Sequence, residues 1–168
     1  MDRTQLSPEV LRAAKRVELL LLDCDGVLTD GRLYFSSKGE AMKSFHVHDG
    51  QGIKNWQRAG FRTGIITGRE SPIARARAEE LGVEFFLEKV SDKAAALDDL
   101  MGATELSASQ IAFVGDDIAD LGPMKRVGFP VAVAQCAPEL DEVALYKTLR
   151  HGGAGAIREV VDLLLGAR

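Results

Sequence analysis

Nearly continuous apolar runs divide the sequence at regular intervals. Residues 17–22 read VELLLL, a pattern typical of a parallel strand that is covered on both faces rather than on one. Similar runs occupy residues 61–66, 83–87 and 111–114, and shorter ones lie near 131–133 and 145–148. The pattern therefore predicts five or six buried strands.

Helix-like segments separate these runs. Ser7 and Pro8 predict a helix start, because serine caps helix N-termini and proline suits the first helical position. Gly60 and Gly82 stand where a glycine would end a helix. Helices are predicted over residues 8–16, 54–59, 73–81 and 91–101, and from about 156 onward. Strands alternating with helices predict an α/β fold built on a doubly wound parallel sheet, as one domain over residues 1–168.

Two segments depart from this alternation. Residues 32–47 contain two β-prone stretches around SSKGE, which predicts a β-hairpin with a glycine turn directly after the first strand. We expect it to act as a flap over the end of that strand, with no large cap domain. Residues 151–156 (HGGAGA) are predicted to be a flexible segment, because glycine makes the backbone permissive.

Polar side chains follow the predicted strands where each strand ends. The first strand leads into Asp23 and Asp25, the second into Thr67 and Arg69, the third toward Lys93, and the fourth into Asp116, Asp117 and Asp120. In open parallel sheets a ligand site lies beyond the carboxyl ends of the strands. Clustered carboxylates suit Mg²⁺, and a nearby hydroxyl and ammonium would hold a phosphoryl group. The sequence therefore predicts a magnesium-dependent phosphoryl-transfer site.

Composition narrows the class of protein only slightly. The chain of 168 residues is 46% hydrophobic and 27% charged, with a formal net charge of -4, which is typical of a soluble globular protein. This mild acidity gives no support to a nucleic-acid-binding face. No run of about 18 apolar residues and no signal-like start occur, so we expect no membrane association and a cytoplasmic location. Cys24 and Cys136 are interpreted as small core residues.

The motifs DCDGVLTD, ITGR, SDK and GDDIAD, in this order, resemble the four motifs of the haloacid dehalogenase superfamily of aspartate-nucleophile phosphohydrolases. The resemblance implies that Asp23 attacks phosphorus and that Asp25 serves as general acid and base. Thr67 and Lys93 would bind the transferring phosphoryl group. The implied Mg²⁺ site consists of Asp23, the backbone carbonyl of Asp25 and Asp116, supported by Asp117 and Asp120.

A closer resemblance rests on SSKGEAMKSFHVHDGQGI, ITGRESPIARARAEELGV and HGGAGAIREVVDLLL. These stretches are similar to the 3-deoxy-D-manno-octulosonate 8-phosphate phosphatase family of lipopolysaccharide sugar synthesis. The resemblance implies a small acidic sugar phosphate as substrate, and a homotetramer in which hairpins and C-terminal tails lie near neighbouring active sites. Arg69, Arg77 and Lys43 are the candidates to pair with the substrate carboxylate, since cationic side chains bind carboxylates.

Other interpretations stay open. His48 stands where many relatives have arginine, so a phosphatase for a nonulosonate 9-phosphate is the alternative within the family. A phospho-acceptor signalling module would also combine acidic residues, Mg²⁺, threonine and lysine. In such a module the acceptor aspartate ends a strand in the middle of the chain, whereas here Asp23 and Asp25 end the first long strand. A catalytically silent scaffold is a third class. His46 and His48 are interpreted as polar flap residues, and Gly50 and Gly52 are expected to let the base of the flap approach the site.

Overall fold

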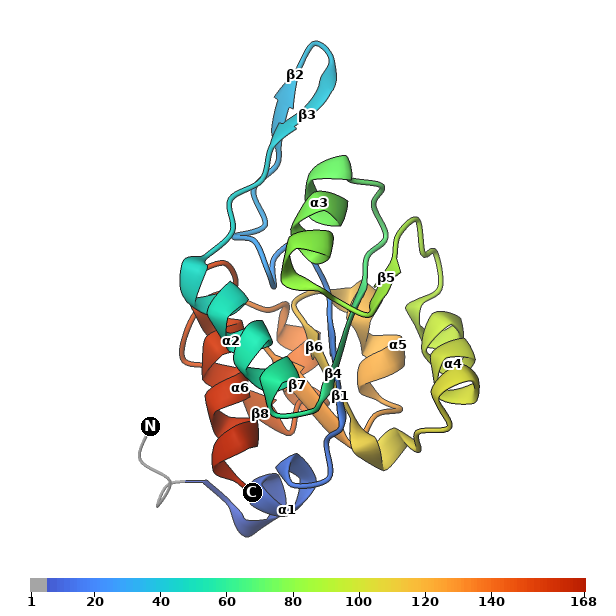
Figure 1. The fold of residues 1–168 in the computed structure, drawn as a ribbon, viewed down its shortest axis with the longest axis vertical. Helices are drawn as coiled ribbons and strands as arrows, with labels where there is room; N and C mark the ends of the chain where they lie inside the picture. Colours follow the sequence, from blue (N-terminus) through green and yellow to red (C-terminus); the bar gives the residue numbers. More distant parts are fainter. Residues whose placement is uncertain (1–5) are drawn as a thin grey trace.

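Six parallel strands form the main sheet, in the order β5-β4-β1-β6-β7-β8 (Figure 1). A computed structural model describes residues 6–168. The strands are β1 (Leu19–Leu22), β4 (Arg62–Ile66), β5 (Phe85–Leu87), β6 (Ile111–Gly115), β7 (Phe129–Ala132) and β8 (Tyr146–Lys147). This confirms the predicted doubly wound parallel sheet.

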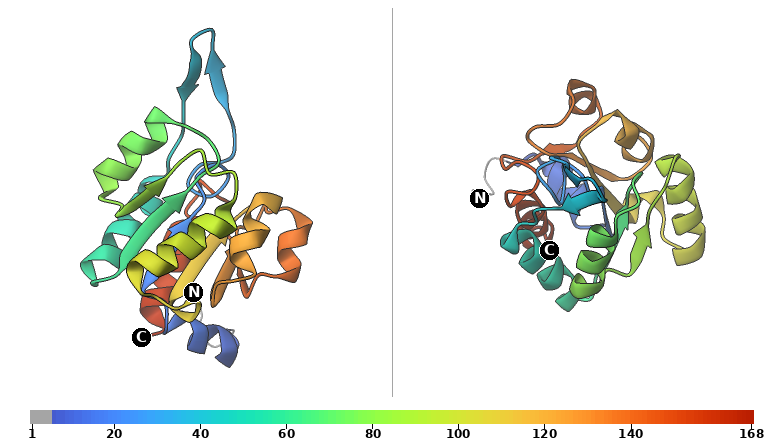
Figure 2. Two further views of the ribbon diagram at one scale, coloured as in Figure 1. Left: turned by 90° about the vertical axis from the view of Figure 1, so that its right-hand side faces the viewer. Right: turned by 90° about the horizontal axis from the view of Figure 1, so that it is seen from above.

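Helices cover both faces of the sheet (Figure 2). One face carries α1 (Pro8–Ala14), α2 (Val47–Arg58), α3 (Pro72–Leu81) and α6 (Ala156–Gly166), and the other carries α4 (Lys93–Thr104) and α5 (Leu121–Met124). Short 3₁₀ turns are η2 (Ala108–Gln110), η3 (Ile118–Asp120) and η4 (Pro138–Glu142). Within residues 6–168, no helix combines the length and the apolar character needed to span a membrane.

Strand β1 is buried on both of its faces. Leu20 and Leu22 pack into the core cluster beneath α2 and α6, while Leu19 and Leu21 pack into the cluster beneath α4 and α5. Burying a leucine side chain contributes roughly 1.5–3 kcal/mol, so these four residues anchor the centre of the sheet. The double burial explains why the sequence of this strand is continuously apolar rather than alternating.

The order of the strands creates a switch point beside β1. After β1 the chain continues to β4 and β5 on one side, and it then crosses to β6, β7 and β8 on the other. Loops that leave β1 and β6 therefore diverge, which opens a crevice at the carboxyl ends of these two neighbouring strands.

The predicted hairpin is present and projects from the body of the molecule (Figures 1 and 2). Strands β2 (Tyr34–Ser36) and β3 (Gly39–Met42) pair with each other in antiparallel register. Gly39 has a φ of 105°, a conformation that favours glycine and that explains the turn.

Helix α2 corrects one sequence prediction. It begins at Val47 rather than near residue 54, so Gly50 and Gly52 lie inside a helix and not at the base of a flap. A β-carbon at position 52 would lie 3.0 Å from the Cα of Arg158 in α6. Glycine lowers helix propensity by about 1 kcal/mol relative to alanine, but here it permits the close packing of α2 against α6.

The glycine-rich segment before α6 lies against the loop that follows β1. The backbone N–H of Gly153 donates to the carbonyl of Val27 at 3.0 Å, and that of Gly152 donates to Gln135 Oε1 at 2.9 Å. A β-carbon at position 152 would collide with the carbonyl oxygen of Gly26. The glycines that predicted flexibility therefore serve close backbone contact in this structure.

Candidate active site

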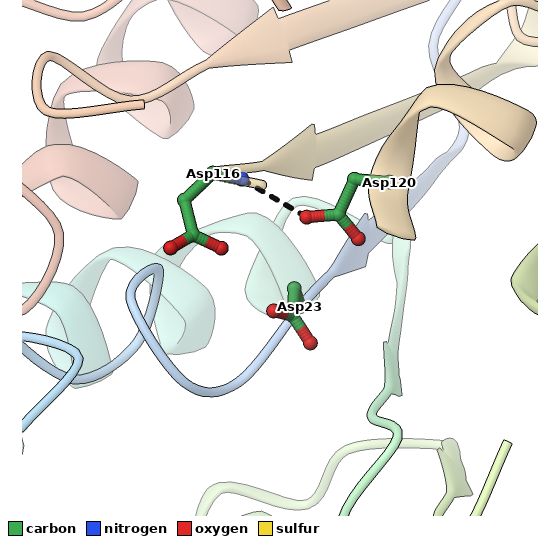
Figure 3. A group of neighbouring side chains, drawn as sticks. All are labelled: Asp23, Asp116 and Asp120. Carbon is green, nitrogen blue, oxygen red and sulfur yellow. Dashed lines mark hydrogen bonds between the residues drawn. The ribbon is translucent and has the colours of Figure 1, made fainter. Parts of the chain in front are cut away.

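Three carboxylates converge at the switch point (Figure 3). Asp23 follows β1, Asp116 follows β6, and Asp120 ends η3; one oxygen from each lies within 4.8 Å of the others. Asp23 and Asp120 are buried and Asp116 is half-buried. They line an open pocket of about 590 Å³, to which Asp25, Thr67, Arg69, Lys93 and Asp117 also contribute. The structure thus brings together eight of the residues that the sequence singled out.

The loop after β1 is shaped by Gly26. This residue has a φ of 93°, and a β-carbon there would collide with the carboxylate of Asp116. Its backbone N–H donates to Thr29 Oγ1 at 3.2 Å, which fixes the turn. Burial, together with the charge of Asp25, raises the pKa of the Cys24 thiol to about 12, so this side chain packs as a neutral group.

Lys93 connects two of the carboxylates. Its ammonium lies 2.8 Å from Asp23 Oδ1 and 2.7 Å from Asp120 Oδ1. The residue opens α4, where the side chain of Asp92 caps the backbone N–H groups of Ala94 and Ala95. Burial alone would lower the pKa of Lys93, but the two carboxylates outweigh it and raise that pKa. A fixed positive charge therefore lies beside Asp23.

Asp120 and Asp117 mainly organise the loop after β6. Asp120 Oδ2 accepts the backbone N–H of Asp116 at 2.9 Å and that of Asp117 at 3.4 Å, while its other oxygen contacts Lys93. Asp117 accepts the backbone N–H of Ile118 at 2.8 Å. Among the described residues, the side chains of Asp25 and Asp117 are not part of the three-carboxylate cluster.

The electrostatics of the cluster favour a bound cation. Burial, with the charge of Asp120, raises the pKa of Asp23 to about 6, and burial with the charge of Asp23 raises that of Asp116 to about 7. Both shifts express the cost of holding neighbouring negative charges away from water. A divalent ion with a preference for oxygen ligands would offset that cost, so the side chains present fit Mg²⁺.

We expect the metal-free protein to gain stability as the pH falls from about 8 to about 5. Asp23 and Asp116 take up protons in the folded state near pH 6 and 7, whereas their ordinary value of 3.8 applies to the unfolded chain. The two ionised carboxylates therefore destabilise the folded state fully above these folded-state pKa values. This destabilisation disappears as the pH falls. Allowing for solvent screening, the gain is on the order of 1 kcal/mol, measurable as the midpoint of thermal unfolding in EDTA.

Asp116→Asn is the matched control for this pH dependence. It should be more stable than the wild type at pH 8 in EDTA, and its stability should depend less on pH. Added Mg²⁺ should raise the unfolding temperature of the wild type far more than that of the variant, since a ligand that binds only the folded state stabilises it. An Asp116→Asn variant with the same pH and Mg²⁺ dependence as the wild type would contradict this account of the cluster.

Asp25 faces a different set of partners. Its carboxylate forms an ion pair with Lys43 through Oδ1, and Arg69 Nε lies 3.7 Å from Oδ2. Thr67 lies at the end of β4 with its side chain buried, and its hydroxyl accepts the backbone N–H of Arg69 at 3.4 Å. Asp25, Thr67 and Arg69 all line the pocket.

Two of the three residues predicted to bind a substrate carboxylate lie elsewhere. Arg77 packs against α2 and pairs with Glu80 at 2.8 Å, with its guanidinium over the ring of Phe45. Lys43 is buried between Asp25 and Glu40, so its charge is already matched. Neither residue lines the pocket. Arg69 remains a candidate to bind a substrate carboxylate, because it lines the pocket and its side chain is 42% exposed.

Sequence reasoning missed Gln135 in the loop after β7. Its side-chain amide donates to the carbonyl of Gly26 at 2.7 Å and accepts the N–H of Gly152, so it joins the loop after β1 to the glycine-rich segment. No sequence pattern around a glutamine in a loop predicts such a contact. The contact arises because the tertiary fold brings the loop after β7 against the turn at Gly26.

Comparisons with known proteins agree with this geometry. Residues 46–128 match the family model of the haloacid dehalogenase-like hydrolases. The chain is 41% identical over 163 residues to 3-deoxy-D-manno-octulosonate 8-phosphate phosphatase KdsC of Salmonella typhimurium, covering 97% of this chain and 87% of that protein.

Solved structures show the same likeness. The 3-deoxy-D-manno-octulosonate 8-phosphate phosphatase of Yersinia pestis has a TM-score of 0.94 at 39% identity, covering 96% of this chain and 88% of that one. That of Moraxella catarrhalis, solved with magnesium ion, phosphate ion and KDO, has a TM-score of 0.93 at 36% identity, covering 95% and 92%.

Fold, site and comparisons together define the class: this is a haloacid dehalogenase-like hydrolase. Within that class, the chain belongs to the 3-deoxy-D-manno-octulosonate 8-phosphate phosphatase family.

Proposed function

We propose that this protein is a Mg²⁺-dependent phosphatase that converts 3-deoxy-D-manno-octulosonate 8-phosphate to 3-deoxy-D-manno-octulosonate and phosphate. The observation that carries the proposal is the buried contact of Lys93 with Asp23 beside a carboxylate cluster suited to a divalent cation. The relative solved with magnesium, phosphate and KDO supports the choice of substrate.

In the first half-reaction, a carboxylate oxygen of Asp23 attacks phosphorus. The bond from phosphorus to the sugar oxygen breaks, and the protonated carboxyl of Asp25 gives its proton to that oxygen. Thr67 and Lys93 hold the other phosphoryl oxygens, because positioning and charge neutralisation dominate this chemistry. The products are the free sugar acid and an aspartyl-phosphate on Asp23.

In the second half-reaction, the Asp25 carboxylate takes a proton from water as the water oxygen attacks phosphorus. The bond between phosphorus and Asp23 breaks, which releases phosphate and restores both aspartates to their starting states. One group thus serves as acid and then as base, which explains why two aspartates follow one strand at a spacing of two.

The carboxylates of Asp23 and Asp116 and the backbone carbonyl of Asp25 would hold Mg²⁺, with Asp117 and Asp120 supporting that shell from the loop. When bound, the ion neutralises charge on the phosphoryl oxygens and so reduces their repulsion from Asp23. Asp120 contributes by fixing Lys93 and the backbone of Asp116, contacts that it makes in the structure.

Arg69 is the proposed partner of the substrate carboxylate. It lines the pocket next to Asp25, and its side chain is partly exposed. Arginine binds carboxylates through two parallel hydrogen bonds, which suits recognition of a sugar acid.

We also propose a cytoplasmic homotetramer whose hairpins lie near neighbouring active sites. Exposed apolar side chains on and beside the hairpin support association: Leu33, Phe35, Met42 and Val47. Phe35 is 61% exposed and Val47 is 78% exposed, and large apolar side chains that gather at a surface often mark a protein interface.

Substrate choice is tested by phosphate release from a panel of esters in the presence of Mg²⁺. We expect the octulosonate 8-phosphate to have a kcat/KM at least about 10-fold above nonulosonate 9-phosphates and simple sugar phosphates, and EDTA to abolish turnover. Preference for a 9-phosphate would be consistent with the proposed mechanism but would show that the substrate is a nonulosonate 9-phosphate. A stable phosphorylated Asp23 without release would favour a phospho-acceptor module instead.

A further inference from the structure

A buried lysine lies where the hairpin joins the body of the protein. Lys43 directly follows β3, and its side chain is only 1% exposed. Its ammonium forms one ion pair with Asp25 Oδ1 and a second with Glu40 Oε1 at 3.1 Å. Burying an ammonium is costly unless it is paired, so these two carboxylates fix where Lys43 lies.

Glu40 extends this contact toward α3. Its second oxygen, Oε2, accepts a hydrogen bond from the hydroxyl of Ser71, which also accepts the backbone N–H of Ala74 at 3.1 Å and so caps α3. Ser71 is buried. A continuous polar chain therefore runs from Asp25 through Lys43 and Glu40 to the start of α3.

The two cations around Asp25 have different access to the pocket. Arg69 lines the pocket and lies 3.7 Å from Asp25 Oδ2, whereas Lys43 contacts Oδ1 and does not line the pocket. Lys43 therefore holds the carboxyl group without occupying the space where a substrate would bind. The backbone that follows Asp25 is also held, because the N–H of Gly26 donates to Thr29 Oγ1.

We propose that Lys43 is a positioning residue for proton transfer. It holds the carboxyl of Asp25 in the orientation from which this group protonates the departing sugar oxygen, and through Glu40 it makes that orientation depend on how the hairpin is seated on α3. The inference rests on the proposed phosphatase function. It assigns Lys43 to Asp25 rather than to the substrate carboxylate.

The test compares two leaving groups in the wild type and in Lys43→Met. A sugar alkoxide needs a proton as it departs, whereas p-nitrophenolate is a stable anion that needs little help from an acid. The ratio kcat/KM reports the steps up to release of the leaving group. We expect Lys43→Met to lose about 10²-fold or more in kcat/KM for the octulosonate ester, and less than about 10-fold for p-nitrophenyl phosphate.

Further variants separate positioning from folding. Lys147→Met is the matched control and should leave both rates unchanged, because Lys147 is an exposed lysine that pairs with Asp141 at 2.6 Å and does not line the pocket. Lys43→Arg, which keeps a cation, should recover part of the loss. Lys43→Gln can still donate to a carboxylate and keeps the test available should the methionine variant not fold, as judged by circular dichroism.

The outcomes distinguish the inference from the proposed function. Equal losses for the two esters in a folded variant, or no loss for either, would overturn the positioning role while wild-type turnover upheld the phosphatase. A wild type that hydrolyses neither ester would overturn both. Rescue by arginine without any difference between the two leaving groups would assign Lys43 to structure alone.

Discussion

Asp23→Asn is expected to abolish phosphate release, with a loss of roughly 10⁴-fold or more in kcat. The amide has no anionic oxygen with which to attack phosphorus. Lys93 also loses the partner that lies 2.8 Å from its ammonium, although its contact with Asp120 remains. The measurement is phosphate release from the octulosonate ester with saturating Mg²⁺, together with mass spectrometry for a phosphorylated residue.

Asp30→Asn is the matched control for this change. Asp30 lies in the same loop, but it is exposed, pairs with Arg32 at the surface and does not line the pocket. Its substitution should leave kcat within about 2-fold of the wild type, because exposed ion pairs contribute little. EDTA-sensitive release by Asp23→Asn at a rate near that of the wild type would refute Asp23 as the nucleophile.

Lys93→Met is expected to lower kcat by roughly 10²- to 10³-fold, as is typical when one group that stabilises developing charge is removed. The ammonium is the positive side-chain charge that lies against both Asp23 and Asp120. Its loss leaves those buried carboxylates unpaired, so the variant should also unfold at a lower temperature. Turnover and thermal unfolding, each measured with and without Mg²⁺, separate the two effects.

The control for Lys93→Met is Lys89→Met. Lys89 lies in the same connection between β5 and α4, but it is exposed and pairs with Glu70 at 2.6 Å. We expect its substitution to change kcat by less than about 2-fold. A Lys93→Met enzyme that keeps its kcat once stability is restored by Mg²⁺ would show that this ammonium has no part in the reaction.

The local sequence pattern was sufficient to predict the sheet and the central residues of the site. The apolar run that becomes β1 had to be buried on both faces, and parallel strands bring their carboxyl ends to one edge. Asp23, Thr67, Lys93 and Asp116 could therefore be predicted to meet, since each follows a strand closely and little chain separates it from that edge.

Contacts between distant segments could not be predicted in the same way. The sequence made Arg77 a candidate partner of the substrate carboxylate because of its charge, but it did not indicate that Arg77 contacts Glu80 and Phe45 within the chain. It interpreted Gly50 and Gly52 as letting the base of the flap approach the site, whereas both lie inside α2, where Gly52 permits the close approach of α6 and Gly50 packs against α3. In each case the sequence showed the type of residue, but the residue that it contacts depends on tertiary packing.

The sequence by itself determined which polar side chain follows which strand. It thereby predicted a site of carboxylates, a hydroxyl and an ammonium group that suits phosphoryl transfer. Tertiary structure alone decided which charges meet. Lys43 lies 18 residues from Asp25 and Gln135 lies 109 from Gly26. Such pairings depend on how loops and helices pack once the sheet has formed, and burial then selects partners that no local periodicity encodes.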